Sequence, residues 1–264
     1  MDLTVTPRGD ATIDVRFDAE VCYIRFARPE AGNTITHALI DDVGHALRLC
    51  ETQARIVVLE GSPQAFCLGA DFAGIRQELE AGRQFPDQDP APLYDLWQKL
   101  ARGPFVSIAH VRGKANAGGV GFVAACDIVL CDETAVFSLS EMLFGLMPAC
   151  VLPFLIRRVG FARANLLTLG TQTLSARQAE QWGLVDACEE NGENLLRKHL
   201  LRLKRLTKPA IARYKRYAGE LDGFFSAARP AALQANIDVF SDPVNLENIR
   251  RYVSTGRFPW DAGL

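Results

Sequence analysis

Four glycines lie close together near the middle of the chain, in the stretch VRGKANAGGVGF at residues 111–122. The residues before them, FVSIAHVRG, have the apolar character of a buried strand, and residues 116–125 have that of an apolar helix. Glycine is required where another group approaches the backbone so closely that no side chain fits. The stretch therefore predicts a strand-to-helix turn against which a ligand or another backbone segment packs.

The chain around this stretch alternates predicted strands with predicted helices. Two strands with alternating apolar residues, at 13–17 and 21–27, are separated by DAE and predict a hairpin. Apolar residues at helical spacing from 39 to 50 precede the buried strand RIVVLEG. Further helices are expected at 72–82, 91–102 and 116–125, and further strands at FVSIAHVRG, DIVLCD and AVFSLS. This order predicts an α/β core.

The last quarter of the chain is expected to be helical. Ser175 and Gln178 fit a capping box that opens the helix ARQAEQW, and the strand LVDAC follows it. Beyond that strand the pattern is helical, so we expect a core over residues 1–190 and a helical subdomain over residues 191–264. The stretch FPDQDPAP at residues 85–92 is predicted to be a mobile insert.

Composition restricts the partners and the compartment. A net charge of −2 and a pI near 6.1 argue against a surface committed to nucleic acid or to an anionic membrane. Seven scattered cysteines, without a C-x-x-C pair, predict neither disulfides nor a zinc site, and a reducing cytoplasm is expected. Cys67 and Cys150 have no histidine nearby in the sequence and are interpreted as buried small residues. The sequence shows no signal peptide and no membrane-spanning run.

Two segments place glycine between a predicted strand and a predicted helix, namely FCLGADF at residues 66–72 and NAGGVGF at residues 116–122. The first N–H groups of a helix lack intrahelical partners, so two such junctions that face each other can hold a developing oxyanion. The alternative is that the glycines serve tight packing. The spacing fits neither G-x-G-x-x-G nor G-x-x-x-x-G-K-[ST].

FCLGADF, followed by HVRGKANAGGVGFVAACDIVLCD and FSLSEMLFGLMP, resembles the crotonase (enoyl-CoA hydratase/isomerase) superfamily across nearly the whole chain. The resemblance implies a spiral of ββα turns, a C-terminal helical region used for trimer assembly, and an acyl thioester substrate. It also implies that the N–H groups of Ala70 and Gly118 form an oxyanion hole. The stretches APLYDLWQKLARGPFVSIAHVRGKANAGG and LLRKHLLRLKRL resemble the 3-hydroxy-3-methylglutaryl-ACP dehydratases of polyketide β-branching.

Hydratases of this superfamily use two glutamates, which map to Glu141 and to Gly121, where this chain has no carboxylate. The resemblance therefore favours dehydration by Glu141 alone, acting first as base and then as acid. The alternatives are an isomerase, a decarboxylase, or a binding protein that has lost turnover. No metal or redox cofactor is implied. The expected partner is an acyl carrier protein, or an acyl-CoA, and the expected assembly is a homotrimer or a dimer of trimers.

Other side chains have open interpretations. Asp71 is a candidate catalytic residue beside Ala70, or the N-cap of the helix that follows. His110 is a core histidine or a proton shuttle. Tyr94 and Trp97 share a helical face and either pack or line the acyl pocket. Residues 197–216 hold nine Lys or Arg and no acidic residue, which indicates a solvated face, a subunit contact or a docking surface for an acidic carrier.

Overall fold

The computed structural model describes residues 4–5, 11–81 and 89–263. The first half of the stretch predicted as a mobile insert, residues 85–88, therefore lies outside the described residues, and its last two residues begin a helix. The larger of two sheets has seven strands in the following spatial order. They are β1 (Thr4–Val5), β2 (Ile13–Asp18), β3 (Val21–Phe26), β4 (Ile56–Glu60), β6 (Val106–Val111), β8 (Ile128–Cys131) and β11 (Ala187–Cys188).

The larger sheet combines the predicted antiparallel hairpin with parallel strands. β2 and β3 pair antiparallel, and β3, β4, β6, β8 and β11 are parallel in that order. Every residue of β4 is buried. Val57 and Leu59 face one core, whereas Ile56 and Val58 face another on the opposite side of the sheet. A strand that is buried on both faces explains why RIVVLEG is apolar throughout.

A second, smaller sheet supports the glycine-rich turns. Its strands, in spatial order, are β10 (Leu174–Ser175), β9 (Val136–Ser138), β7 (Lys114–Asn116) and β5 (Ala65–Cys67). β5 corresponds to the strand expected before Gly69, whereas β7, which also has three residues, was not predicted from the sequence. The helix predicted from residue 116 begins instead at Gly118, because Asn116 still pairs with Ser138 in the sheet.

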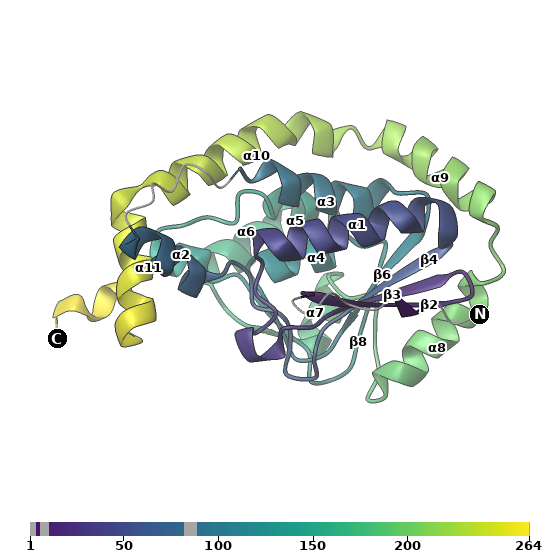
Figure 1. Cartoon of the computed structure of the whole chain (residues 1–264), viewed down its shortest axis with the longest axis horizontal. Helices are drawn as coiled ribbons and strands as arrows, with labels where there is room; N and C mark the ends of the chain where they lie inside the picture. The colour runs from purple at the N-terminus through teal and green to yellow at the C-terminus, as the bar shows by residue number, and fades with distance from the viewer. Residues whose placement is uncertain (1–3, 6–10, 82–88, 264) are drawn as a thin grey trace.

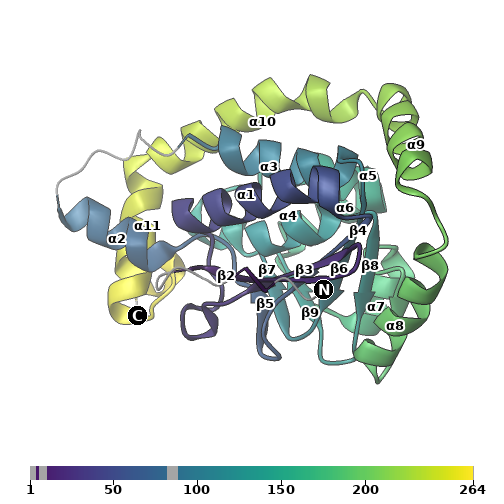
Figure 2. The same ribbon diagram turned by 45° about the vertical axis from the view of Figure 1, so that its right-hand side comes forward.

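Helices cover both faces of the larger sheet (Figures 1 and 2). The helices of the core are α1 (His37–Gln53), α2 (Phe72–Glu80), α3 (Ala91–Arg102), α4 (Gly118–Ala125), α5 (Leu152–Val159), α6 (Phe161–Gly170) and α7 (Ala176–Trp182). Short 3-10 turns are η1 (Pro29–Ala31), η3 (Glu141–Phe144) and η4 (Pro259–Gly263). α7 opens with the predicted capping box of Ser175 and Gln178. α5 and α6 were not predicted from the sequence.

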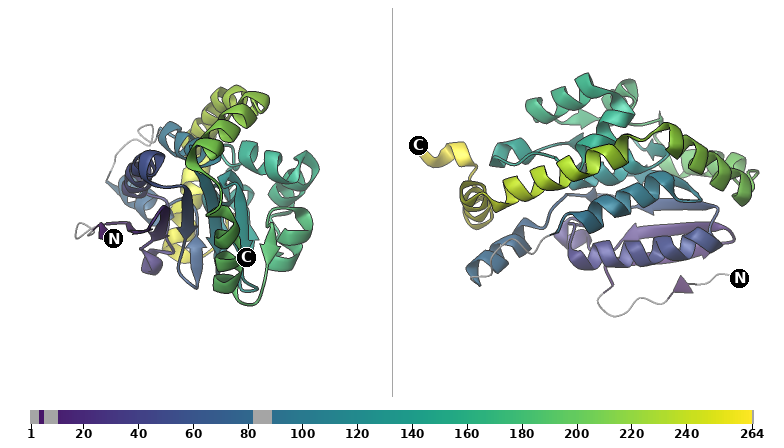
Figure 3. Two further views of the ribbon diagram at one scale, coloured as in Figure 1. Left: turned by 90° about the vertical axis from the view of Figure 1, so that its right-hand side faces the viewer. Right: turned by 90° about the horizontal axis from the view of Figure 1, so that it is seen from above.

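Helices alone follow Cys188 in the described part of the chain: α8 (Gly192–Leu203), α9 (Lys208–Leu221), α10 (Phe224–Ser241) and α11 (Pro243–Thr255). α8 packs on the sheet face opposite α1, α3 and α4, and α10 crosses over α3 and α5 (Figure 3). Phe225 and Ala232 of α10 belong to the main core. The fold is thus the expected α/β core with a C-terminal helical region, and that region contributes to the core.

The C-terminal helices reach both ends of the molecule. α8 and α9 lie at one end, and α2 with α11 at the other (Figure 1). Phe144 of η3 makes edge-to-face contacts with Phe72 of α2 and Tyr252 of α11, with ring centroids 5.2 and 5.0 Å apart. No helix among the described residues has the length and apolar character needed to cross a bilayer.

Candidate active site

The two glycine-containing junctions face each other, as the sequence analysis expected. Gly69 precedes α2 and has a positive φ of 89°, which favours glycine. A Cβ built on it would lie 2.7 Å from the Cβ of Ala117 and 3.3 Å from the nitrogen of Gly118. The turn after β5 and the turn before α4 are therefore in direct backbone contact.

The N–H groups of Ala70 and Gly118 are available at this contact. In the described part of the chain, neither donates to a protein acceptor, whereas the adjacent N–H of Ala117 is bonded to the carbonyl oxygen of Ser138, 3.0 Å away. Ala117 has φ 52° and ψ −123°, a strained conformation for a residue with a side chain. This backbone geometry supports the predicted oxyanion hole, since it leaves two unpaired donors beside each other.

The other three glycines of the central stretch pack against protein groups, as the alternative interpretation of tight packing expected. A Cβ on Gly113 would lie 2.3 Å from backbone atoms of Gln64, and one on Gly119 would lie 2.1 Å from the carbonyl oxygen of Cys67. On Gly121 it would lie 2.5 Å from the indole of Trp97. Gly118 alone among the four adjoins the free donors.

Glu141 is the first residue of η3 and is only 9% exposed. Burial raises the pKa of its carboxyl to about 7, while hydrogen bonds from its own backbone and that of Ser140 act in the opposite direction. Its Oε2 has no hydrogen-bond partner in the described part of the chain. A carboxyl with these properties can both take up and release a proton near neutral pH.

Asn116 joins the three segments of the site and was not predicted from the sequence. Its Nδ2 donates to Ser140 Oγ at 3.0 Å and to the carbonyl oxygen of Leu68 at 3.4 Å. Its Oδ1 accepts from Ser138 Oγ at 2.7 Å. One side chain thus fixes the turn before Ala70 and the segment before Glu141 relative to the start of α4. The only sequence signal was a polar side chain just before the glycines that open α4.

We expect Asn116→Ala to reduce kcat by tenfold or more, because a small displacement of the groups that surround a reacting centre costs much of the rate. Three hydrogen bonds are lost, so the free energy of unfolding should also fall by about 1–3 kcal/mol. Ser107→Ala is the matched control, since Ser107 is buried and bonded to Asp127 and to Leu100, away from these turns. A variant at 116 that loses stability but keeps its kcat would contradict the positioning role.

Asp71 and Tyr94 have structural partners. Asp71 Oδ1 accepts from the N–H of Gly74 at 3.2 Å and caps α2, so its alternative interpretation as a cap has direct support, and a catalytic role stays a prediction. The Tyr94 hydroxyl donates to the carbonyl oxygen of Phe225 at 2.9 Å. Burial raises the pKa of the Cys67 and Cys150 thiols to about 12, which agrees with their interpretation as buried small residues.

His110 lies on the α8 side of the sheet. Its Nδ1 is 2.9 Å from Glu60 Oε1, and its Nε2 has no partner within the described ranges. Among the described residues, Glu60, His110 and Glu193 offer atoms within 4.8 Å of one another, a geometry that could hold a metal ion. Glu193 is paired with Arg112 at 3.3 Å. Glu60 and Glu193 are therefore each paired with a side chain of the chain, namely His110 and Arg112.

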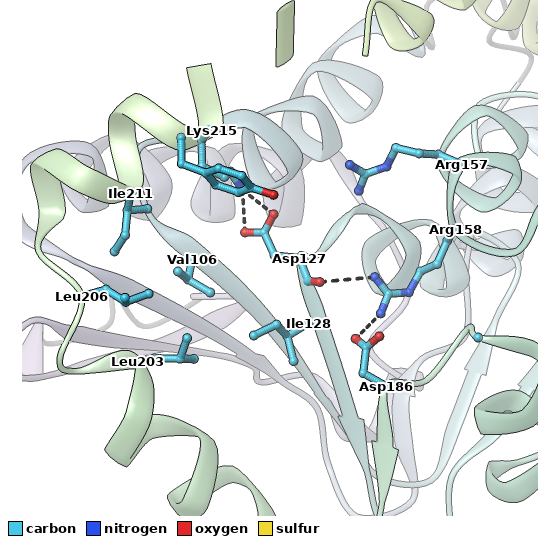
Figure 4. A pocket seen from close by; sticks show the side chains of 12 residues that line it. Val106, Asp127, Ile128, Arg157, Arg158, Asp186, Leu203, Leu206, Ile211 and Lys215 are labelled. Atoms are coloured by element: carbon cyan, nitrogen blue, oxygen red, sulfur yellow. Dashed lines mark hydrogen bonds and ion pairs between the residues drawn. The ribbon is translucent and has the colours of Figure 1, made fainter. Parts of the chain in front are cut away.

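A pocket of about 510 Å³ lies under α9, away from Glu141 (Figure 4). In it Lys215 forms an ion pair with Asp127 at 2.5 Å, and Arg158 pairs with Asp186. Lys215 belongs to the basic segment at residues 197–216. In the same segment Lys198 pairs with Glu189, and Lys208 donates to backbone carbonyl groups at the end of α1. Much of this basic charge is thus used within the chain.

Residues 16–263 match the enoyl-CoA hydratase/isomerase family model, so the chain belongs to the enoyl-CoA hydratase/isomerase family. A curated relative is the bacillaene synthase dehydratase PksH of Bacillus subtilis, 57% identical over 252 residues that cover 95% of this chain and 96% of the relative. An enoyl-CoA hydratase of Thermus thermophilus is 33% identical over 169 residues, which cover 63% of this chain and 67% of the relative.

Solved structures agree with this assignment. The crystal structure of a polyketide biosynthesis enoyl-CoA hydratase, PksH of Bacillus subtilis, matches with 56% identity and a TM-score of 0.93, covering 96% of this chain and 100% of that one. An enoyl-CoA hydratase/isomerase of Xanthobacter autotrophicus Py2 is 24% identical, with a TM-score of 0.82 and 95% coverage of both chains, and shows the shared fold. The predicted crotonase fold and an enzyme of the dehydratase type are confirmed.

Proposed function

We propose that the protein removes water from a 3-hydroxy-3-methylglutaryl thioester carried by an acyl carrier protein, giving the 3-methylglutaconyl thioester in polyketide β-branching. The observation that carries the proposal is the single buried carboxyl of Glu141, with a pKa of about 7, in a site with two unpaired backbone donors. The name of the 57% identical relative, a dehydratase of bacillaene synthase, supports the same chemistry.

The reaction needs one acid/base group and one oxyanion hole. The thioester oxygen accepts from the N–H groups of Ala70 and Gly118, which stabilise an enolate when the Glu141 carboxylate removes the C2 proton. The enolate then re-forms the carbonyl group and expels the C3 hydroxyl, which leaves as water with the proton returned by Glu141. The C2=C3 bond forms, and Glu141 ends ionised, as it began. Because one carboxyl serves both steps, the C2 proton and the hydroxyl must lie on the same face of the acyl chain.

The proposal includes a carrier-protein partner, a cytoplasmic location and a homotrimer or dimer of trimers. Large apolar side chains exposed on α6 and α9 support an oligomer, since such surfaces usually become covered. They are Phe161, Leu166, Leu169, Tyr214, Tyr217 and Leu221. The basic segment at residues 197–216 lies mostly on α8 and α9, at the end opposite α2 and α11 (Figure 1). Carrier docking on that segment would therefore serve the site of another subunit.

Mass spectrometry of the carrier-bound substrate tests the proposal. Incubation of the 3-hydroxy-3-methylglutaryl carrier with the enzyme should convert it to a species lighter by one water, and the matching coenzyme A thioester should react more slowly. Loss of carbon dioxide would instead identify a decarboxylase. An unchanged mass after incubation at high enzyme concentration would overturn the dehydratase proposal and leave an isomerase or a binding protein.

A further inference from the structure

The indole N–H of Trp97 is a buried donor without an acceptor in the described part of the chain. Trp97 is only 1% exposed. Native proteins leave few buried polar groups unpaired, because each one carries a desolvation penalty. Tyr94, one turn earlier on α3, has its hydroxyl satisfied by Phe225. The unpaired N–H of Trp97 therefore calls for a partner that is not part of the protein.

The benzene-ring edge of the indole, which adjoins the ring carbon bonded to this N–H, lies along the face of α4 that begins at Gly118; its Cη2 would lie 2.6 Å from a Cβ built on Gly121. A Cβ built on Gly121 would lie 2.5 Å from Cζ2 of Trp97 and 2.9 Å from Cε2, the ring carbon bonded to Nε1. Cζ2 also lies 3.9 Å from the Cβ position of Gly118. The same ring edge thus adjoins Gly118 and the residue one helical turn beyond it.

The ring is held in place before any ligand arrives. Phe122 of α4 and Phe154 of α5 each contact the indole edge-to-face, with centroids 5.8 Å away. These contacts fix the direction of the N–H, so no rotamer freedom is lost when it meets an acceptor. A donor fixed in this way can discriminate between ligands that do and do not supply the acceptor.

The geometry points to Trp97 as a substrate-binding donor whose indole N–H meets the 3-hydroxyl of the acyl chain. Residues three apart on a helix lie about 5–6 Å apart, a distance similar to that between a thioester oxygen and a substituent on C3. With the C1 oxygen held at Gly118, the hydroxyl on C3 comes to the level of Gly121. The hydrogen bond stabilises the negative charge that develops on the departing oxygen, while Glu141 supplies the proton. This inference rests on the proposed function.

A spectrum of ¹⁵N-labelled tryptophan tests the contact directly. The chain has three tryptophans, so the indole region holds three cross-peaks, and the peak missing in Trp97→Phe assigns the one of interest. In Glu141→Gln, which should bind the ligand and turn it over only slowly, the pantetheine thioester of 3-hydroxy-3-methylglutarate should move the Trp97 proton downfield. The 3-deoxy thioester should leave it near its free position. Equal shifts with both ligands, or no shift with either, would overturn the inference.

Binding constants give an independent test. In the Glu141→Gln protein the hydroxy thioester should bind about tenfold more tightly than the 3-deoxy thioester, as one buried hydrogen bond allows. Adding Trp97→Phe should reduce that ratio to about one, and the control Tyr94→Phe should keep it. If Trp97→Phe leaves this ratio unchanged, the N–H does not bind the 3-hydroxyl. If Trp97→Phe instead removes the preference for the hydroxy thioester over one that lacks only the terminal carboxylate, the N–H binds that carboxylate. If the wild type releases no water, the proposed function fails; if it does and the Trp97 peak is unmoved, only this inference fails.

Discussion

Replacing Glu141 by Gln should lower the rate of dehydration by about 10²–10⁴-fold, because the amide can neither take the C2 proton nor return it to the hydroxyl. Binding of the thioester should be retained, since the substitution leaves the proposed oxyanion donors, the N–H groups of Ala70 and Gly118, unchanged. Single-turnover rates and equilibrium binding of the carrier-bound substrate separate the two effects. Turnover close to that of the unmodified enzyme would contradict the role of Glu141.

The same carboxyl should set the pH dependence of the reaction. Glu141 must begin ionised to act as base, and its pKa is raised to about 7 by burial. We therefore expect kcat/KM to fall about tenfold per pH unit below pH 7 and to level off above it. The small residual rate of Glu141→Gln should lack this inflection.

Glu141→Gln should also stabilise the fold at alkaline pH. The pKa of Glu141 rises from 4.5 to about 7 on folding, so the folded state disfavours the ionised form. The cost reaches about 3 kcal/mol above pH 7 and vanishes below pH 4.5, where the carboxyl is protonated in both states. Relative to the unmodified protein, the free energy of unfolding of the variant should therefore rise by about 2.5 kcal/mol between pH 5 and pH 8.

Glu60→Gln is the control for that measurement because its shift has the opposite sign. Burial alone would raise the pKa of Glu60, but the hydrogen bond to His110 and the charges of His110, Arg25 and Arg112 outweigh it and lower the pKa. Ionised Glu60 thus stabilises the folded state at neutral pH, and this contribution is lost as the pH falls. The Gln variant at 60 should be less stable than the unmodified protein at pH 8. Parallel pH trends in the two variants would refute the assigned environment of Glu141.

The sequence predicted the elements that are long or uniformly apolar. β4 was recognisable because both of its faces are buried, and the start of α7 because its capping box is a local signal. β7 was missed because three residues carry no periodicity, and its pairing with β5 and β9 depends on contacts distant in sequence. A helix was expected from Asn116 for the same reason, since only the pairing with Ser138 delays its start.

The sequence named the groups that are proposed to react at the candidate site, and it did not name the side chains that support them. Ala70, Gly118 and Glu141 lie in segments whose resemblance to a family is specific. The role given to Asn116 depends on the hydrogen-bond partners of its amide, and the role given to Trp97 depends on its indole N–H having no partner. Neither property can be recognised from the neighbouring residues in the sequence. The burial that raises the pKa of Glu141 is likewise a property of the packed core.

Gly118→Val should lower kcat/KM by at least 10²-fold, a loss comparable to removal of one oxyanion donor. A Cβ on Gly118 would lie 2.6 Å from Ile35 Cδ1, the movable end of a partly buried side chain, and 3.8 Å from Gly69 Cα. The new side chain therefore displaces Ile35 and crowds the contact between the two turns, where the thioester oxygen is expected. The free energy of unfolding of Gly118→Val should change only slightly, so the loss of kcat/KM should not be explained by unfolding.

Neighbouring substitutions separate obstruction of the site from damage to the fold. Gly118→Ala adds one methyl group in the same direction. Its kcat/KM should lie between that of the unmodified protein and that of Gly118→Val. Gly119→Ala should instead unfold the protein or lower its Tm sharply, because its Cβ would lie 2.1 Å from the carbonyl oxygen of Cys67, and backbone cannot move aside as a side chain can. Kinetics with the carrier-bound substrate and thermal unfolding of each variant give both readouts. Normal turnover by a folded Gly118→Val would place the thioester away from this turn, since valine leaves no room for an oxygen beside that N–H.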